Sequence, residues 1–345
     1  MSDPTGDALL RVEGLRTWFP IRAGLMQRTV GYVRAVDDVG FEIPKGRTMA
    51  LVGESGCGKT TVGRSILRLI DPQAGRIWFD GVDLLSLGRR ELHRYRSEIQ
   101  IVFQDPMASL DPRMRVRDAI AEGMHSFGIG ASESERTERV AAILERVQLD
   151  PSQMSRYPHE FSGGQRQRLC IARALAVEPR LIICDEATSA LDVSIQAQIL
   201  NLLRDLQDEF GLTYLFITHD LRVVRYLADR VAVMYVGQIV EEGATEQLFE
   251  TPSHPYTQGL LAAIPSVDPE NRGIAAMVRG DVPSPSNPPR GCRFHPRCPV
   301  AFERCRQEEP PTFFRDGQRS RCFLATSDPP PAKPGADSGA SARAG

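Results

Sequence analysis

The sequence lacks long apolar runs and has little net charge of either sign. Its apolar stretches, such as 181–184 and 231–236, are far shorter than the ~20 residues that a transmembrane helix needs. Residues 1–7 are polar, with no basic segment followed by an apolar one, so we expect no secretory signal. The 42 Lys+Arg nearly cancel the 44 Asp+Glu, for a net charge of −2, which excludes a general basic field for nucleic acid. We therefore predict a cytosolic protein without a nucleic-acid partner.

The 345 residues have room for about two domains. Residues 8–265 alternate apolar strand-like runs with amphipathic helical stretches, which is typical of an α/β fold on a mostly parallel sheet. Buried strands are predicted at 48–52, 181–185 and 213–218. Helical spacing predicts one helix through Val140, Ile143, Leu144 and Val147, and another through Ile195, Ile199, Leu202, Leu203 and Leu206 that ends at Gly211.

The chain becomes proline-rich and irregular from about residue 251. We expect a small appended extension at 266–326, which contains four of the seven cysteines. Residues 327–345 are nearly all Ala, Pro, Gly, Ser and Asp, with too little apolar surface to offset the entropy of ordering, so this tail is predicted to be disordered.

The most specific segment is a glycine-rich loop that matches G-x-x-x-x-G-K-[ST] in full. It follows the predicted strand 48–52 and precedes a helical stretch at 62–69, which is the context that a phosphate-binding loop requires. Its backbone N–H groups would face phosphate oxygens, Lys59 would bring its charge to the β and γ phosphates, and the Thr60 hydroxyl suits Mg²⁺. The loop consists of Gly53, Glu54, Ser55, Gly56, Cys57, Gly58, Lys59, Thr60 and Thr61.

A second apolar strand, 181–185, ends in two carboxylates. Asp185 can hold Mg²⁺, and Glu186 can polarise an attacking water as a general base. Such a pair on its own is more often a solvated strand end. In one chain with the phosphate loop, it predicts nucleotide hydrolysis.

A Ser-Gly-Gly turn opens a predicted helix between those two elements. Ser162, Gly163, Gly164 and Gln165 would form a second anion site at the helix N-terminus. The chain has only one phosphate loop that carries a lysine. We therefore expect this turn to cover the nucleotide held by another ATPase subunit.

Together these motifs resemble the ABC-type ATPase family over roughly residues 9–265. The 162–165 segment resembles the signature motif of the family, with Phe161 in place of the leading Leu. The resemblance implies a P-loop NTPase fold of ABC type, with a mostly parallel core sheet, an antiparallel β subdomain and a helical subdomain at about 105–160. It also implies ATP and Mg²⁺ as ligands, and two subunits that sandwich two ATP molecules head to tail.

Four further residues receive roles only through this resemblance. Gln104 matches the Q-loop glutamine, which touches Mg²⁺ and the water and senses the membrane partner. Asp192 belongs to the matched D-loop, and His219 matches the switch histidine beside the γ-phosphate. Phe19 stands where the family places an aromatic ring on adenine, with Trp18 as the alternative.

Segments 157–165 and 253–257 resemble the dipeptide and oligopeptide importer branch of the family, and so do the Pro-rich run into Cys292 and the long loop 19–35. This resemblance implies two transmembrane permeases, a second ABC ATPase that is a paralogue or another copy of the chain, and an extracytoplasmic peptide-binding protein. The protein would sit on the cytoplasmic side of the inner membrane, and residues 107–149 would receive the permeases.

Two other functions stay open. Similar machines carry other solutes, such as nickel chelates. A non-transport ABC protein could clamp a soluble or nucleic-acid partner, although the single cassette and the lack of coiled-coil heptads argue against this alternative.

The cysteines are unevenly distributed. Four lie in one 31-residue window (322 − 292 + 1) with the spacing C-x5-C-x6-C-x16-C, which indicates metal rather than disulfides in a reducing compartment. The spacing lacks the C-x2-C knuckles of zinc ribbons and favours a four-iron four-sulfur cluster, which the importer resemblance also implies. Zinc and ordinary cysteines are the alternatives. The expected ligands are Cys292, Cys298, Cys305 and Cys322, with His295 non-ligating, whereas Cys57, Cys170 and Cys184 are interpreted as small buried residues.

Overall fold

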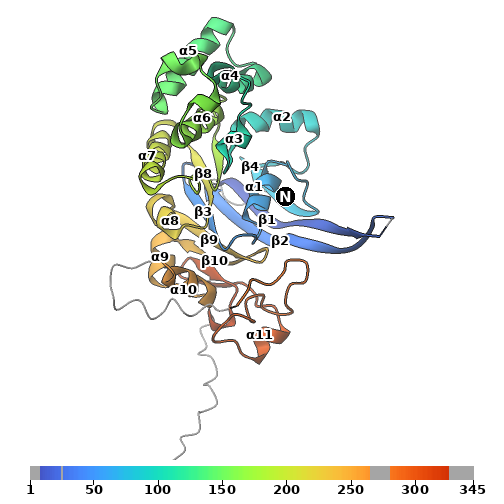
Figure 1. Ribbon diagram of the computed structural model, residues 1–345. Coiled ribbons are helices and arrows are strands. Elements are labelled where there is room, and N and C mark those ends of the chain that lie inside the picture. The colour runs from blue at the N-terminus through green and yellow to red at the C-terminus, as the bar shows by residue number, and fades with distance from the viewer. Residues whose placement is uncertain (1–7, 25, 265–279, 326–345) are drawn as a thin grey trace, which may run out of the picture.

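The computed structural model describes residues 8–24, 26–264 and 280–325. Figure 1 shows a central sheet with helices along it, a group of helices at one end and the C-terminal segment at the other. The tail predicted at 327–345 lies outside the described residues, and so do residues 1–7 and the 265–279 part of the expected extension.

An eight-stranded sheet forms the centre, in the order β11-β12-β10-β9-β3-β8-β7-β6. Neighbours from β9 to β6 are parallel, and the remaining pairs are antiparallel. The strands predicted at 48–52, 181–185 and 213–218 are confirmed, and each is buried along its whole length, as a parallel strand covered on both faces must be. The strands are β3 (Thr48–Val52), β6 (Ile99–Val102), β7 (Leu181–Asp185), β8 (Thr213–Thr218), β9 (Arg230–Tyr235), β10 (Gln238–Ala244), β11 (Phe313–Arg315) and β12 (Gln318–Ser320).

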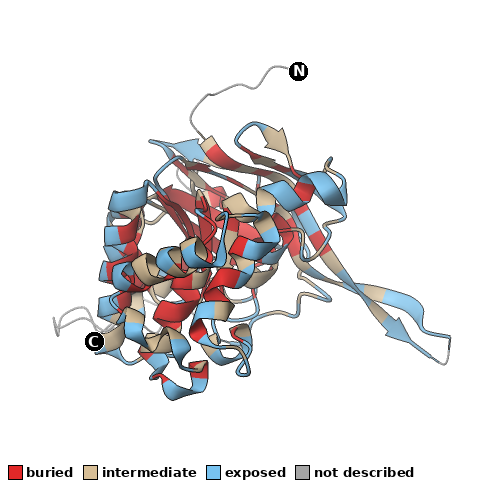
Figure 2. Ribbon diagram, turned by 90° about the horizontal axis from the view of Figure 1, so that it is seen from above, coloured by how far each residue is buried: buried red, intermediate tan, exposed pale blue. Residues whose placement is uncertain are grey.

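A four-stranded antiparallel sheet in the order β2-β1-β4-β5 confirms the predicted β subdomain. Its long β1–β2 hairpin projects from the body, and Figure 2 shows that the outer part of this hairpin is exposed. The strands are β1 (Ala8–Ala23), β2 (Arg28–Pro44), β4 (Ala74–Phe79) and β5 (Val82–Asp83).

Successive residues of the central strands face opposite sides and enter three apolar clusters. Leu51, Ile183 and Ile217 pack with α1 and the antiparallel sheet. Ile182, Tyr214 and Phe216 pack with α6 and α7 on the other side. Gly211 ends α7 at φ 64°, as predicted. The helices that cover the sheet are α1 (Lys59–Ile66), α6 (Gly163–Leu175), α7 (Val193–Phe210), α8 (Leu221–Leu227), α9 (Thr245–Glu250) and α10 (Pro255–Ala262).

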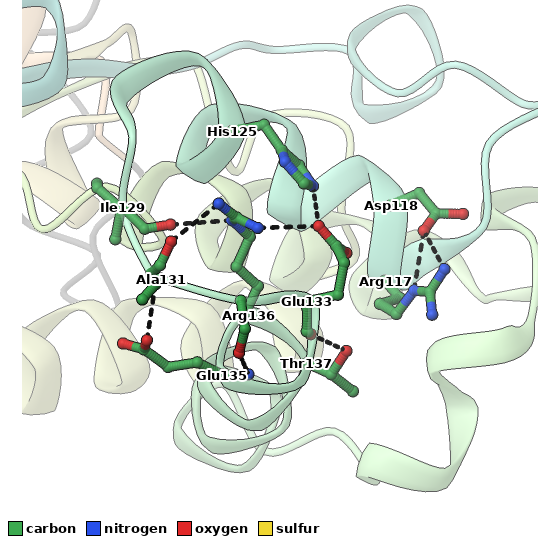
Figure 3. A network of polar contacts seen from close by, with 11 residues as sticks. Arg117, Asp118, His125, Ile129, Ala131, Glu133, Glu135, Arg136 and Thr137 are labelled. Atoms are coloured by element: carbon green, nitrogen blue, oxygen red, sulfur yellow. Dashed lines mark hydrogen bonds and ion pairs between the residues drawn. The ribbon is translucent and has the colours of Figure 1, made fainter.

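Helices α3 to α5 lie within the region 105–160, and α4 packs against both α5 and α6. The turn between α4 and α5 is held by Arg136, which donates to the carbonyls of Ile129 (3.0 Å) and Gly130 (2.8 Å) and pairs with Glu133 (Figure 3). Polar contacts of one arginine therefore tie the start of α5 to the turn that follows α4. The elements here are α2 (Arg89–Glu98), α3 (Pro106–Ser109), α4 (Val116–Phe127), α5 (Glu133–Arg146), η1 (Pro151–Ser155) and η2 (Pro158–Glu160).

The C-terminal segment belongs to the main sheet and core, whereas we expected a separate appended extension. Its strand β12 pairs with β10, with Ser320 opposite Glu241, so the segment extends the main sheet. Phe294 is 1% exposed and joins the core beside Tyr235 and Tyr256. Hydrogen bonding to a sheet edge and burial of one aromatic ring leave no sign in local composition, which is why the sequence indicated only an irregular appendage. The remaining elements are α11 (Glu303–Gln307) and η4 (Phe323–Ala325).

Within the described ranges, no helix is both long and apolar enough to cross a bilayer.

Candidate nucleotide site

The phosphate loop runs from the end of β3 to the start of α1, as the motif predicts. Two of its glycines have no room for a side chain. A Cβ on Gly53 (φ 155°) would lie 2.1 Å from the carbonyl oxygen of Met234, and one on Gly58 (φ 108°) would lie 1.9 Å from that of Ala35. The backbone of the loop is therefore pressed against the backbones of β9 and β2, which fixes its curl.

Lys59 is 4% exposed and donates through Nζ to the carbonyls of Gly53 (2.8 Å) and Glu54 (3.1 Å). These contacts hold the ammonium group across the loop, where its charge faces an incoming phosphate. Cys57 is buried beneath it, and burial raises the pKa of this thiol. Cys57 is thus a packing residue of the loop. Its backbone is also held in place, because its N–H donates to Glu54 O at 3.3 Å and its carbonyl accepts from Gly237 N at 2.9 Å.

The two expected Mg²⁺ residues lie next to each other. Thr60 Oγ1 donates to Asp185 Oδ1 at 2.8 Å, which joins the start of α1 to the end of β7. Burial raises the pKa of the Asp185 carboxyl. A hydroxyl and a carboxylate at the mouth of the loop are the oxygen ligands that Mg²⁺ takes alongside nucleotide phosphates. The residues present therefore fit this ion.

Glu186 follows directly and has an unusual backbone, with φ 50°. A left-handed conformation is costly for a non-glycine residue, and such strain is concentrated at functional sites. The backbone N–H of Glu186 donates to Ile217 O at 2.9 Å, and its carboxylate lies 3.6 Å from His219 Nδ1. Glu186 and His219 line one open cleft of about 340 Å³ together with Gly53, Glu54 and Ser55 of the loop.

Gln104 approaches the same strand end from β6. Its Nε2 donates to Ser189 Oγ at 3.3 Å, and that hydroxyl donates to Glu186 O at 3.0 Å. The structure thus places the predicted catalytic and metal residues at the carboxyl ends of parallel strands, where ligands of α/β sheets bind. They are Thr60, Gln104, Asp185, Glu186 and His219.

The Ser-Gly-Gly turn begins α6, as expected. Ser162 caps this helix by accepting from Gln165 N, and the Gln165 side chain accepts from Ser162 N in return. A Cβ on Gly164 would lie 2.5 Å from Ile195 Cγ2, so this turn packs against the start of α7. Asp192 caps α7 by accepting from Ile195 N at 2.9 Å. None of these residues is among the described lining of the nucleotide cleft.

Phe19 lies on the β1–β2 hairpin and is 37% exposed. The neighbouring Trp18 packs against Tyr32, with 6.0 Å between ring centroids, and Arg34 lies 5.0 Å from the Trp18 ring. The Trp18 ring therefore packs against other residues of the hairpin, which leaves Phe19 as the more accessible ring. Phe19 is not among the described lining of the cleft.

The four clustered cysteines converge. Cys292, Cys298, Cys305 and Cys322 all line one small cavity, with a free volume of about 10 Å³. Burial raises the pKa of the Cys292 thiol to about 11 and that of Cys322 to about 12. In the part of the chain that the structure describes, no three His, Cys, Asp or Glu side chains are grouped as ligands of a metal ion. The expected iron–sulfur cluster thus has no support from a metal-site geometry and stays a prediction. The other three cysteines, Cys57, Cys170 and Cys184, are buried elsewhere, as interpreted.

Two residues that the sequence analysis did not single out contact the phosphate loop. The Tyr256 hydroxyl accepts from Glu54 N at 3.0 Å, and Arg297 binds the Glu54 carboxylate. Tyr256 falls in a segment that was noted only for its resemblance, and Arg297 is one arginine among many. No local pattern could have assigned either residue to the site.

The loop, the acidic strand end and the neighbouring histidine define a nucleotide hydrolase of the ABC class. Residues 36–189 match the ABC transporter family, and residues 240–305 match the oligopeptide/dipeptide transporter C-terminal region. The chain belongs to the ATP-binding subunits of ABC transporters, in the oligopeptide/dipeptide branch. Its activity is ATP hydrolysis coupled to transport.

Relatives are similar over nearly the whole length. The chain is 52% identical over 319 residues to a probable peptide ABC transporter ATP-binding protein of Sinorhizobium fredii, covering 92% of this chain and 90% of the relative. It is 50% identical over 315 residues to the oligopeptide transport ATP-binding protein AppF of Bacillus subtilis, covering 90% and 95%.

Solved structures share the fold. CbiO1 of Clostridium perfringens, part of an ABC transporter complex, aligns with a TM-score of 0.61 at 30% identity, over 71% of this chain and 92% of that one. An ATP-binding cassette solved as a dimer in a post-hydrolysis state with ADP and phosphate aligns with a TM-score of 0.61 at 28% identity, over 68% and 98%.

Proposed function

We propose that this chain is the ATPase subunit that powers peptide import through an ABC transporter. The observation that carries the proposal is the cleft that joins the phosphate loop to Glu186 and His219. The match of residues 240–305 to the oligopeptide/dipeptide C-terminal region supports peptides as the cargo. The discriminating experiment is uptake of labelled peptides and of a nickel chelate by cells with and without the gene. Loss of nickel uptake alone would favour the alternative cargo.

Each residue of the site has a distinct role in this proposal. The loop amides and Lys59 bind the β and γ phosphates, and Phe19 stacks on adenine. Thr60, Gln104 and Asp185 hold Mg²⁺, which supplies charge neutralisation for the phosphates. Glu186 accepts a proton from the attacking water, and His219, 3.6 Å away, orients that carboxylate and faces the γ-phosphate.

The working unit is a head-to-tail dimer. Ser162, Gly163, Gly164 and Gln165 form a helix N-terminus that does not line the cleft of their own subunit. They therefore complete the site of the opposing subunit, with Asp192 beside them. The relative solved as a dimer with ADP and phosphate supports this arrangement. The opposing subunit is a paralogous ATPase or a second copy of the chain. Two permeases and an extracytoplasmic peptide-binding protein complete the importer, with the ATPases on the cytoplasmic face of the inner membrane.

The permeases dock on the helical subdomain. Met107 on α3 is 45% exposed, and the Arg113 side chain that follows is 90% exposed. Replacing both with alanine is expected to lower peptide uptake at least about tenfold, because a few residues, arginine prominent among them, carry most of the binding energy of an interface. ATP hydrolysis by the isolated subunit, measured in parallel, is expected to stay within about twofold, since neither residue lines the cleft. Equal loss of both activities would refute the docking role. The exposed Arg315→Ala is the control.

The C-terminal cysteines hold a four-iron four-sulfur cluster. Four soft thiols that line one small cavity are the donor set that such a cluster takes. Protein purified without oxygen is expected to contain about four iron and four sulfide per chain, and Cys298→Ala is expected to lose them. Cys170→Ala, which removes a buried cysteine outside the cavity, is the control and should retain them. One zinc per chain, or no metal in the wild type, would contradict the cluster.

A further inference from the structure

The chain between Cys292 and Cys298 reaches the phosphate loop. Arg297 donates through Nη1 to Glu54 Oε2 at 2.6 Å and through Nη2 to Glu54 Oε1 at 2.9 Å. This two-pronged pair joins residues 243 positions apart, and the Arg297 side chain is only 7% exposed. Bidentate arginine–carboxylate pairs combine strength with a fixed orientation. A residue of the C-terminal extension thus sets the direction of a side chain in the phosphate loop.

The segment that carries Arg297 is itself anchored. Arg293 donates to Val236 O at 2.5 Å and forms an ion pair with Asp37. The ring of Phe294 packs edge-on against Tyr235, with 5.3 Å between centroids. Both anchors are buried, so Arg297 projects from a rigid base rather than from a free loop.

Glu54 is held on its other side as well. Its backbone N–H donates to the Tyr256 hydroxyl at 3.0 Å, and its carbonyl accepts from Lys59 Nζ at 3.1 Å. Movement of Glu54 would therefore displace the lysine that meets the phosphates. An unpaired carboxylate in this position would also repel the negative charge of ATP.

We propose that Arg297 is a positioning residue for nucleotide binding, which fixes and neutralises Glu54 so that the phosphate loop and Lys59 stay aligned. Arg297 acts through Glu54 and does not touch the nucleotide. This role rests on the proposed nucleotide site. It also gives the C-terminal extension a function in the ATPase cycle.

The test compares ATP affinity in four forms of the full chain: wild type, Arg297→Gln, Glu54→Gln and the double variant. Arg297→Gln is expected to weaken ATP binding about tenfold, which corresponds to about 1.4 kcal/mol. In the Glu54→Gln background the same change is expected to have little effect, because the repelling carboxylate is gone. Arg297→Lys is expected to recover part of the affinity, since it keeps the charge but loses the fork.

A merely structural ion pair predicts another pattern. Arg297→Gln would then lower the melting temperature but leave the ATP Kd of the folded protein unchanged, and that result would overturn the proposal. An equal loss of affinity in both Glu54 backgrounds would also overturn it. Arg315→Gln, which removes an exposed arginine of the same extension, is the control and should bind ATP like the wild type. Lys59→Ala distinguishes failure of the Arg297 proposal from failure of the proposed nucleotide site, because unchanged ATP binding in that variant would contradict the site itself.

Discussion

Glu186→Gln is expected to bind ATP normally and to hydrolyse it at least about 100-fold more slowly, the effect of removing a positioned general base. The amide keeps the size of the side chain but cannot accept the proton of the attacking water. The strained backbone at φ 50° and the bond from Glu186 N to Ile217 O set the direction of this side chain in both forms. Phosphate release under saturating ATP, together with ATP binding at equilibrium, measures the two properties separately.

Glu145→Gln is the matched control for this variant. Glu145 lies exposed on α5 and is not among the described residues that line the cleft. Its replacement by glutamine makes the same chemical change. It should hydrolyse ATP like the wild type. A Glu186→Gln protein with full activity would refute the assignment of the base, and one that no longer binds ATP would show that the glutamate has a structural role instead.

Lys59→Ala is expected to weaken ATP binding by about 100-fold or more, because it removes a buried charge that meets the phosphates. The Nζ atom of Lys59 donates to two loop carbonyls, so alanine also removes the contacts that hold the curl of the loop. Titration with a fluorescent ATP analogue gives the dissociation constant, and circular dichroism checks that the variant is folded.

Lys45→Ala serves as the control for Lys59→Ala. Lys45 is half-exposed and pairs with Asp80 at 2.9 Å on the surface. Its loss should leave ATP affinity unchanged, since surface ion pairs contribute little. Wild-type affinity in Lys59→Ala would contradict the proposed use of the loop.

The candidate nucleotide site could be predicted from the sequence because its residues occur in short local motifs. A glycine-rich loop needs its glycines at fixed positions, and buried parallel strands need continuous apolar runs, so the loop around Lys59 and the strand before Asp185 both leave a pattern. The helix that ends at Gly211 was predictable for the same reason. Its apolar spacing and its left-handed terminal glycine are local features.

The contacts of the C-terminal extension leave no such pattern. Arg297 and Glu54 meet only because the chain returns to the sheet after more than 200 residues, and β12 finds the edge of β10 through backbone hydrogen bonds that any sequence can make. Composition indicated only an irregular, proline-rich stretch. The spacing of the four cysteines predicted that they lie together, and all four line one cavity. The spacing alone did not identify the group that they bind.

Peptide uptake by cells in which the chromosomal gene carries Glu186→Gln tests most directly whether this ATPase powers peptide transport. If ATP hydrolysis at this site drives import, uptake of labelled di- and oligopeptides falls to the level of a gene deletion, while Glu145→Gln cells import normally. Peptide uptake at the wild-type rate in Glu186→Gln cells, with the protein present at normal levels, would contradict the claim that this ATPase powers peptide transport.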